Sequence, residues 1–300
     1  MAHGLNDSLP DRHVILKEYF VAVVDILGQS ERLRSVRLPQ NEDEEAALVP
    51  VLKDTYGLVY PFRTTFDRFF EAMASAKSTR LKFTPEQAAT FQRLRDFRVV
   101  HHGISDSMFI GIPLDGPEQV TGVYAALFAL AGVFLMFLSQ GYPLRGAADV
   151  GVASDFFPGE LYGPAVAGAY HLEKEVADYP RVVVGEGLLA VLQRLEASPA
   201  RDVEARAAQD TAAACRGLMT TDSDGWPVLD YLGEAYRRTN SERGDLVIDD
   251  LARQALAEAQ TGLRGSRAAR DPKHVARYVR LLQYLSSRDA GGAPSAKPSS

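Results

Sequence analysis

The feature that most constrains this chain is an uncharged stretch from Val120 to Leu138, VTGVYAALFALAGVFLMFL. Its 19 residues are enough to cross a bilayer as a helix. A helix that is apolar on every side is otherwise the buried helix of a large core. The chain must therefore either span a membrane here or surround this helix with other elements, and the neighbouring segments distinguish the two.

Segments on both sides of the stretch are typical of strands in one sheet. Residues 97–102 and 107–114 are rich in β-branched and aromatic residues and flank a turn at 103–106, which predicts a hairpin. Residues 142–154 predict a further strand. A membrane-spanning helix at 120–138 would place the hairpin and this strand on opposite sides of the bilayer. We therefore expect a buried helix and no membrane span.

The remaining patterns predict an α+β protein. The expected elements are a buried strand at 17–27, helical residues at 49–76 with a break at 57–61, a helix from Pro85 to Arg95, a helix at 163–178, a short strand at 181–185, a helical region at 187–217, an edge strand at 226–232, and helices at 246–260 and 272–287. This order is typical of a ferredoxin-like, antiparallel-rich sheet with helices mainly on one face. We expect one domain over 1–288, with extra C-terminal helices, and a disordered tail at 289–300.

Composition excludes several classes of protein. The 300 residues carry a formal net charge of −6, which argues against nucleic-acid binding. The only cysteine, Cys215, rules out a disulfide framework within the chain. The first residues have no cationic flank followed by an apolar run, so no signal peptide is expected. A cytoplasmic location is expected.

Two aspartates stand at positions that suit chemistry. Asp25 ends the first buried strand, and Asp106 lies at the hairpin tip between two serines. If the two strands are neighbours, the carboxylates converge at one end of the sheet and suit Mg²⁺ or Mn²⁺ bound to a triphosphate. A turn or cap role is the alternative for each aspartate, and spacing alone leaves both open. Phosphate-loop, nucleophile-elbow and zinc motifs are absent.

Four segments resemble motifs of the class III nucleotidyl cyclases, in the order of that family. They are YFVAVVDILGQS at 19–30, VVHHGISDSMFIGIPL at 99–114, LRGAADVGVAS at 144–154, and ELYGPAVAGAYHLEKEVADYPRVVVG at 160–185. The last segment, together with SDGWPVLDYL near the C-terminus, is closer to the bacterial pyrimidine cyclases of Pycsar anti-phage defence. The resemblance covers most of residues 15–285.

This resemblance implies a metal-dependent cyclase. Asp25 and Asp106, with the backbone carbonyl of Ile26, would bind two divalent ions, Mn²⁺ or Mg²⁺. Arg145 is a candidate phosphate contact, with a structural ion pair as the alternative. His171 matches the position of the family's transition-state arginine and could donate to the transition-state charge, with a surface residue of a helix as the alternative. The family's site lies between two chains, which implies a head-to-tail homodimer in which His171 and Glu160 act on the partner's metal site.

Departures from the family concern the base. His102 stands where purine cyclases have a base-reading lysine, Glu160 where they usually have aspartate, and Ala167 where they have a ribose-positioning asparagine. Further candidate base contacts lie between the two aspartates: Tyr56, Tyr60 and Arg63. The resemblance implies a pyrimidine nucleoside triphosphate, UTP rather than CTP, and a cyclic product, cUMP, that a separate effector protein of the same defence system reads.

Three alternatives stay open. A cytidylate or purine cyclase would keep the same metal site. An inactive cyclase fold would bind nucleotide without turnover, although such a fold would be expected to lose its metal ligands first, and both are present here. A diguanylate-cyclase-like or polymerase-palm enzyme usually carries two acidic groups at the hairpin tip, whereas Ser105 and Ser107 flank Asp106 here.

Overall fold

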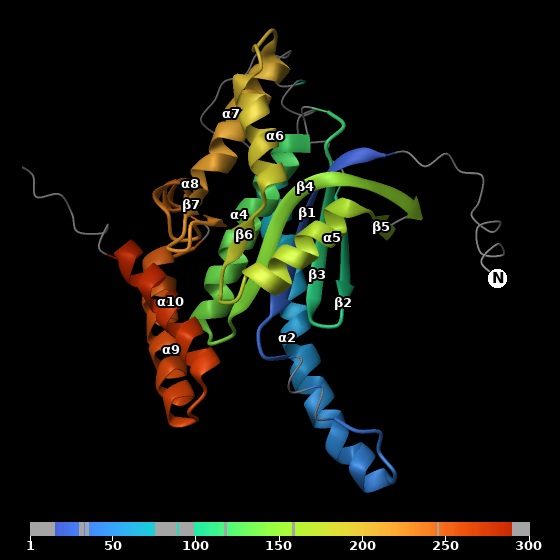
Figure 1. The fold of residues 1–300 in the computed structure, drawn as a ribbon, viewed down its shortest axis with the longest axis vertical. Coiled ribbons are helices and arrows are strands. Elements are labelled where there is room, and N and C mark those ends of the chain that lie inside the picture. Colours follow the sequence, from blue (N-terminus) through green and yellow to red (C-terminus); the bar gives the residue numbers. More distant parts are fainter. Residues whose placement is uncertain are drawn as a thin grey trace, which may run out of the picture.

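A computed structural model of the chain describes residues 16–29, 33, 36–75, 89, 99–116, 119–157, 160–244 and 246–289 (Figure 1). Its elements are β1 (Lys17–Ile26), α2 (Glu42–Ser75), β2 (Val100–Ile104), β3 (Ser107–Pro113), α4 (Gln119–Ser139), β4 (Leu144–Phe157), β5 (Glu160–Tyr162), α5 (Pro164–His171), the π-helix η2 (Leu172–Val176), β6 (Val182–Val184), α6 (Glu186–Ala197), α7 (Val203–Gly217), β7 (Met219–Thr221), β8 (Pro227–Leu229), α8 (Glu234–Arg243), α9 (Ile248–Ala268) and α10 (Pro272–Asp289).

The strands form one mixed sheet in the order β2-β3-β1-β4-β6-β8-β7, and β5 pairs with the end of β4. Neighbouring strands are antiparallel except β4 and β6, which run parallel. Along the chain, α2 connects β1 to β2, and α4 connects β3 to β4. The α+β class predicted from the sequence is confirmed.

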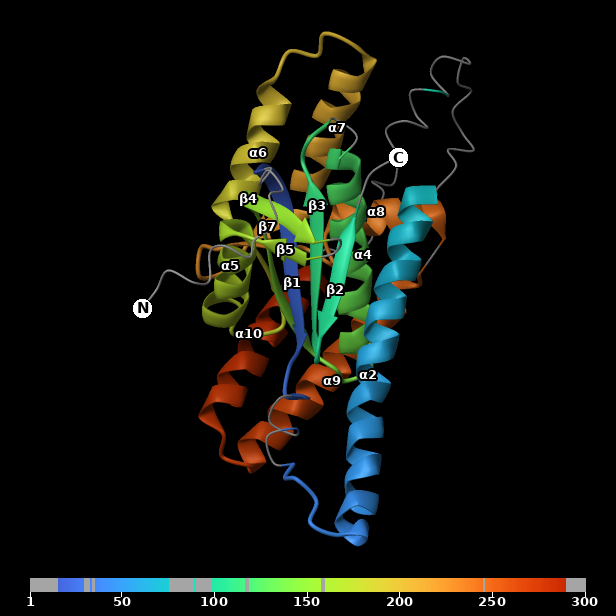
Figure 2. The same cartoon turned by 90° about the vertical axis from the view of Figure 1, so that its right-hand side faces the viewer.

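The two faces of the sheet differ in what covers them. Strand β1 shows why, because successive side chains of a strand point to opposite faces. Phe20, Ala22 and Val24 enter the main core with α2 and α4, whereas Tyr19 and Val21 pack in a smaller cluster with α5. Figure 2 shows α4 and α2 on one side of the sheet and α5 on the other. The prediction that helices lie mainly on one face agrees with this arrangement.

Helix α4 is the uncharged stretch of the sequence, and it joins the β2–β3 hairpin to β4 as expected. By length and composition it is the one helix among the described residues that could cross a membrane, yet 83% of its most apolar window is buried inside the protein. Such burial is that of a core helix. Helices α2, α7 and α9 surround it in the main core.

The predicted break at Gly57–Pro61 is wrong, because α2 is continuous and contains both Pro50 and Pro61. A proline inside a helix removes one backbone hydrogen bond. Gly57 lies four residues before Pro61 and is exposed, so water can reach its carbonyl. The buried side chains of Phe62 and Phe66 hold this part of α2 in the main core, which offsets the loss.

Other predicted boundaries differ as well. The hairpin turn is shorter than 103–106, because Gly103 pairs with Met108 and Ile104 with Ser107. The predicted helix at 163–178 changes from α5 to the π-helix η2 after His171, and the region 187–217 forms two helices separated at 198–202. The predicted helix at 85–95 lies outside the described residues apart from residue 89, and the predicted tail 289–300 lies outside them apart from Asp289, the last residue of α10.

Strand β8 is not the edge strand that Pro227 predicted. It lies between β6 and β7, and β7 is the edge. Proline is tolerated because Pro227 is the first residue of β8 and pairs with Thr221 of the edge strand, while Val228 makes the pairing with β6. The sequence patterns did not predict β7 or α8.

Candidate functional site

Asp25 and Asp106 lie at the same end of β1 and β3, which are neighbours, as their convergence in the sequence analysis required. Asp25 is paired with Ser107 across β1 and β3, so Asp106 directly precedes its partner in the register. The hydroxyl of Ser107 donates a hydrogen bond to Oδ1 of Asp25 at 3.1 Å. A two-residue turn, Ser105–Asp106, places the second carboxylate at the tip of the hairpin.

Both carboxylates are poorly hydrated. Burial raises the pKa of Asp25, and the negative charge of Asp106 raises it further, against the opposing effect of Arg145. Asp106 is 8% exposed, and its Oδ2 is buried with no hydrogen-bond partner among the residues that the structure describes. A buried carboxylate oxygen without a partner is costly, so this end of the sheet favours a cation.

The donor set fits a hard divalent cation. Carboxylate and carbonyl oxygens are the ligands that Mg²⁺ and Mn²⁺ prefer. The side chain of Ile26 is 3% exposed and lies in the main core, so only its backbone is available to the site. Within the described part of the chain, no group of three or more metal-ligating side chains occurs. Substrate oxygens and water would therefore complete the coordination.

Arg145 forms an ion pair within the protein. It is paired with Asp25 across β1 and β4, and its Nη2 lies 3.5 Å from Oδ2 of Asp25. Its Nε lies 2.6 Å from Oε1 of Glu173. The structure therefore supports the structural ion pair that was the alternative to a phosphate contact.

Glu173 was missed by the sequence reasoning. Its side chain is 4% exposed, and burial raises its pKa to about 7 despite the neighbouring Arg145. It lies in the π-helix η2, a local widening that is frequent at functional sites. A signal was available, because Glu173 follows the buried residues Ala165 and Ala169 at intervals of four, which puts a charged residue in an apolar stripe.

Arg63, a candidate base contact, binds the turn of the hairpin. Its Nη2 donates to the carbonyl oxygen of Ser105 at 2.7 Å and to that of Ser107 at 3.2 Å. The residue between them is Asp106. Tyr56 and Tyr60, which were predicted as further base contacts, are 64% and 59% exposed on α2.

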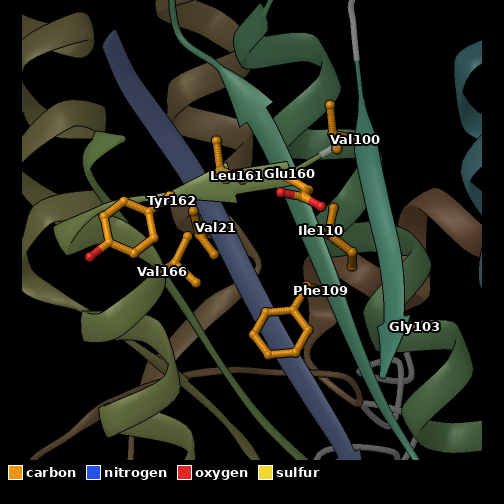
Figure 3. Close-up of a pocket in the computed structure, with 10 residues that line it drawn as sticks. Val21, Val100, Gly103, Phe109, Ile110, Glu160, Leu161, Tyr162 and Val166 are labelled. Carbon is orange, nitrogen blue, oxygen red and sulfur yellow. The ribbon is translucent and has the colours of Figure 1, made fainter. Parts of the chain in front are cut away.

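A pocket of about 490 Å³ lies on the α5 side of the sheet, between β5 and strands β1 to β3 (Figure 3). Glu160, predicted to read the base, is one of its lining residues, and Figure 3 shows it beside Leu161 above the strands. The other lining side chains are mainly apolar: Val21, Val100, Phe109, Ile110, Tyr162 and Val166. Tyr60 is not among them.

The other predicted base contact, His102, is described only in part. Its backbone lies in β2 opposite Phe109, next to Gly103, which lines the pocket. The side chain of His102 lies outside what the structure describes. Val21 in the pocket wall precedes Asp25 by four residues of β1, which is about 13 Å along a strand, and Phe109 pairs with Val23, two residues before Asp25. Since alternate residues of a strand share a face, Asp25 and Val21 lie on the same face of the sheet.

Gly163 fixes the start of α5, which carries the remaining predicted residues. This glycine has φ +145, and a Cβ there would lie 2.8 Å from the carbonyl oxygen of Val152. Helix α5 starts directly after it and presents Ala167 and His171 as exposed side chains. The action of His171 on a partner's metal site stays a prediction.

Comparison of the chain with models of known protein families gives no match. A search of curated proteins also finds no significant relative.

Proposed function

We propose that this chain is a nucleotidyl cyclase that converts a pyrimidine nucleoside triphosphate to the 3′,5′-cyclic nucleotide and pyrophosphate. UTP is the favoured substrate. The observation that carries the proposal is the juxtaposition of Asp25 and Asp106 at one end of the sheet, with a buried oxygen of Asp106 that lacks a hydrogen-bond partner among the described residues. The order of the resembling motifs along the chain supports the same class.

The connectivity is compatible with a ferredoxin-like cyclase domain. The first four strands follow the order β1-α2-β2-β3-α4-β4 in sequence and β2-β3-β1-β4 in space. In this arrangement the central strand β1 and the hairpin end next to each other. A ferredoxin-like sheet serves unrelated functions, so the proposal depends on the site rather than on the fold alone.

The proposed reaction needs positioning and charge neutralisation more than a protein nucleophile. The ribose 3′-oxygen forms a bond to the α-phosphorus, the bond from that phosphorus to the bridging oxygen breaks, pyrophosphate leaves, and the 3′-hydroxyl proton passes to solvent. Asp25, Asp106 and the Ile26 carbonyl would hold two divalent ions. When bound, such ions neutralise the triphosphate and lower the pKa of the 3′-hydroxyl.

Neighbouring residues hold the first aspartate in place. Ser107 donates to one oxygen of Asp25, and Arg145 lies beside the other. Glu173 in turn holds Arg145. In this proposal Arg145 orients Asp25. The predicted contact of Arg145 with phosphate is a second role, which a measurement of substrate affinity in an Arg145 variant would test.

The pocket beside Glu160 is the proposed base site. It offers a carboxylate for hydrogen bonding and apolar walls, among them the ring of Phe109, which suits a flat base. The resemblance to the class III cyclases adds a homodimer with shared sites and a separate effector protein that reads the product. A cytoplasmic location is also part of the proposal.

The test is incubation of the pure protein with ATP, GTP, CTP or UTP in the presence of Mn²⁺, with pyrophosphate and cyclic nucleotide measured. The expected result is a cyclic product from UTP. A product from a purine alone would contradict the pyrimidine assignment and leave a purine cyclase. Binding of a nucleotide without any product would identify the inactive alternative.

A matched pair of variants tests the metal ligands. Asp106→Ala should abolish the product while the circular dichroism spectrum stays that of the wild type. Asp115→Ala removes a carboxylate at the opposite end of β3, where it pairs with exposed Lys17, and should leave activity intact. Activity that survives Asp106→Ala would contradict the metal assignment.

A further inference from the structure

Arg63 of α2 binds the turn of the hairpin that carries Asp106. We propose that Arg63 is a positioning residue that sets the place of Asp106 by binding the backbone on both sides of it. The inference rests on the proposed function and extends it, because it names the residue outside the sheet on which the second metal ligand depends.

The hydrogen bonds of Arg63 are placed to control one turn. A single guanidinium nitrogen donates to the carbonyls of Ser105 and Ser107, the residues before and after Asp106. Both acceptors are backbone atoms, so the contact orients the turn whatever the side chains are. A rotation of the turn that moved Asp106 would break at least one of these bonds.

The turn needs such support because its backbone is strained. Ser105 has φ +54, a conformation that glycine adopts freely and serine rarely does. Strained backbone persists only where surrounding contacts hold it, and it is frequent at functional sites. Arg63 binds the carbonyl of this residue, so it stabilises the strained conformer directly.

Helix α2 is a rigid support for Arg63. The residue before it, Phe62, is fully buried and packs edge-on against Phe137 of α4, with ring centroids 5.7 Å apart. The same helix also binds the segment after the first aspartate, since the side-chain amide of buried Gln29 donates to the carbonyl of Thr55 at 2.7 Å. One helix therefore contacts both segments that carry the proposed metal ligands.

The chain leaves room for the guanidinium at one position of β2. A Cβ on Gly103 would lie 1.8 Å from Cζ of Arg63 and 2.1 Å from its Nη1. The obstructed atoms are the far end of a flexible side chain, so Gly103→Ala would displace the guanidinium rather than the strands. This provides a second, independent way to remove the contact while Arg63 keeps its charge.

The experiment measures the Mn²⁺ concentration for half-maximal cyclase activity, together with hydrogen exchange of the peptide that contains residues 103–108. In Arg63→Ala the midpoint should rise about tenfold, the usual effect of losing a group that orients a ligand, with faster exchange in the hairpin. Activity at saturating Mn²⁺ should largely return. Arg63→Lys should restore part of the affinity, because an ammonium can still donate to a carbonyl.

Two comparisons separate positioning from a general loss of structure. Arg68→Ala removes an exposed arginine of the same helix, whose guanidinium lies over the ring of Phe69, and should leave the midpoint unchanged. Gly103→Ala should reproduce the effect of Arg63→Ala. Added to Arg63→Ala, it should cause little further change, because there is no longer a guanidinium to displace.

The outcomes distinguish this inference from the proposed function. If the wild type is active and Arg63→Ala leaves both the Mn²⁺ midpoint and the hairpin exchange unchanged, the inference is wrong and the cyclase proposal stands. If the wild type forms no product, the cyclase proposal is wrong. Calorimetric Mn²⁺ binding and hairpin exchange then decide the inference without turnover, and unchanged values in Arg63→Ala would overturn it.

Discussion

The Nε atom of Arg145 lies 2.6 Å from Oε1 of Glu173, in a pair that is largely withdrawn from water. The same guanidinium reaches Asp25 with its Nη2, 3.5 Å from Oδ2. The Arg145 guanidinium thus lies between Asp25, a proposed metal ligand, and the carboxylate of Glu173 in η2. Burial raises the pKa of Glu173 to about 7, and this shift makes the stability of the protein depend on pH.

Stability of the metal-free protein should fall as the pH rises from about 4.5 to about 7. Glu173 ionises near its ordinary pKa of 4.5 in the unfolded chain and near 7 in the folded one, so unfolding releases a proton between these values. The contribution is full below the lower pKa and is lost above the higher one, a change of about 3 kcal/mol. The raised pKa of Asp25 acts in the same direction.

Urea unfolding at several pH values, with a chelator present, measures this dependence. Glu173→Gln should flatten the curve in that window, because the amide does not titrate. The exposed neighbour Glu175 offers a control, and Glu175→Gln should keep the wild-type slope. A wild-type stability that is constant or increases from pH 4.5 to 7 would contradict the raised pKa.

Asp106→Asn should separate stability from cation binding. Without metal, the variant should be as stable as the wild type or more stable, by up to about 1 kcal/mol, since it removes a buried charge next to Asp25. With Mn²⁺ at about 100 times its dissociation constant, the wild type should gain about 2.7 kcal/mol. The variant should gain little. Thermal unfolding with chelator and with Mn²⁺ measures both, and an equal gain in the two proteins would disprove the site.

Two glycines near α5 should respond in opposite ways to alanine. Gly163→Ala should destabilise the protein by about 2 kcal/mol or more, because the residue has φ +145 and the new Cβ would lie 2.8 Å from the Val152 carbonyl oxygen. Gly168→Ala should stabilise it by about 0.5–1 kcal/mol, since Gly168 lies inside α5 with open space around it. Urea unfolding measures the free energy of unfolding of both variants. Similar effects would argue against the observed backbone geometry at Gly163 and in α5.

Filling the pocket should weaken nucleotide binding without affecting the metal. Val166 lines the pocket from α5, and Val166→Phe would occupy part of its volume of about 490 Å³. Nucleotide affinity should fall about tenfold, which corresponds to about 1.4 kcal/mol. The Mn²⁺ midpoint should stay the same. Val203→Phe, at an exposed position of α7, is the control, and an unchanged nucleotide affinity in Val166→Phe would place the base elsewhere.

Local patterns in the sequence were sufficient for the elements that are apolar and continuous. The uncharged stretch 120–138 predicted a core helix, and the run that ends in Asp25 predicted a buried strand. The hairpin with Asp106 at its tip was also predicted, because alternating residues and a short polar turn are local properties. Convergence of the two aspartates followed once the strands were assumed to be neighbours.

Contacts between distant segments decided the rest. No local pattern indicates that Glu173 pairs with Arg145, or that Arg63 reaches the carbonyls of a turn more than forty residues away. The continuity of α2 through Pro61 depends on burial of Phe62 and Phe66 in the main core. The sequence by itself therefore determined the class of fold and the two proposed metal ligands. Only the tertiary structure decided which residues orient those ligands, because long-range packing and ion pairs fix side chains whose positions no local periodicity encodes.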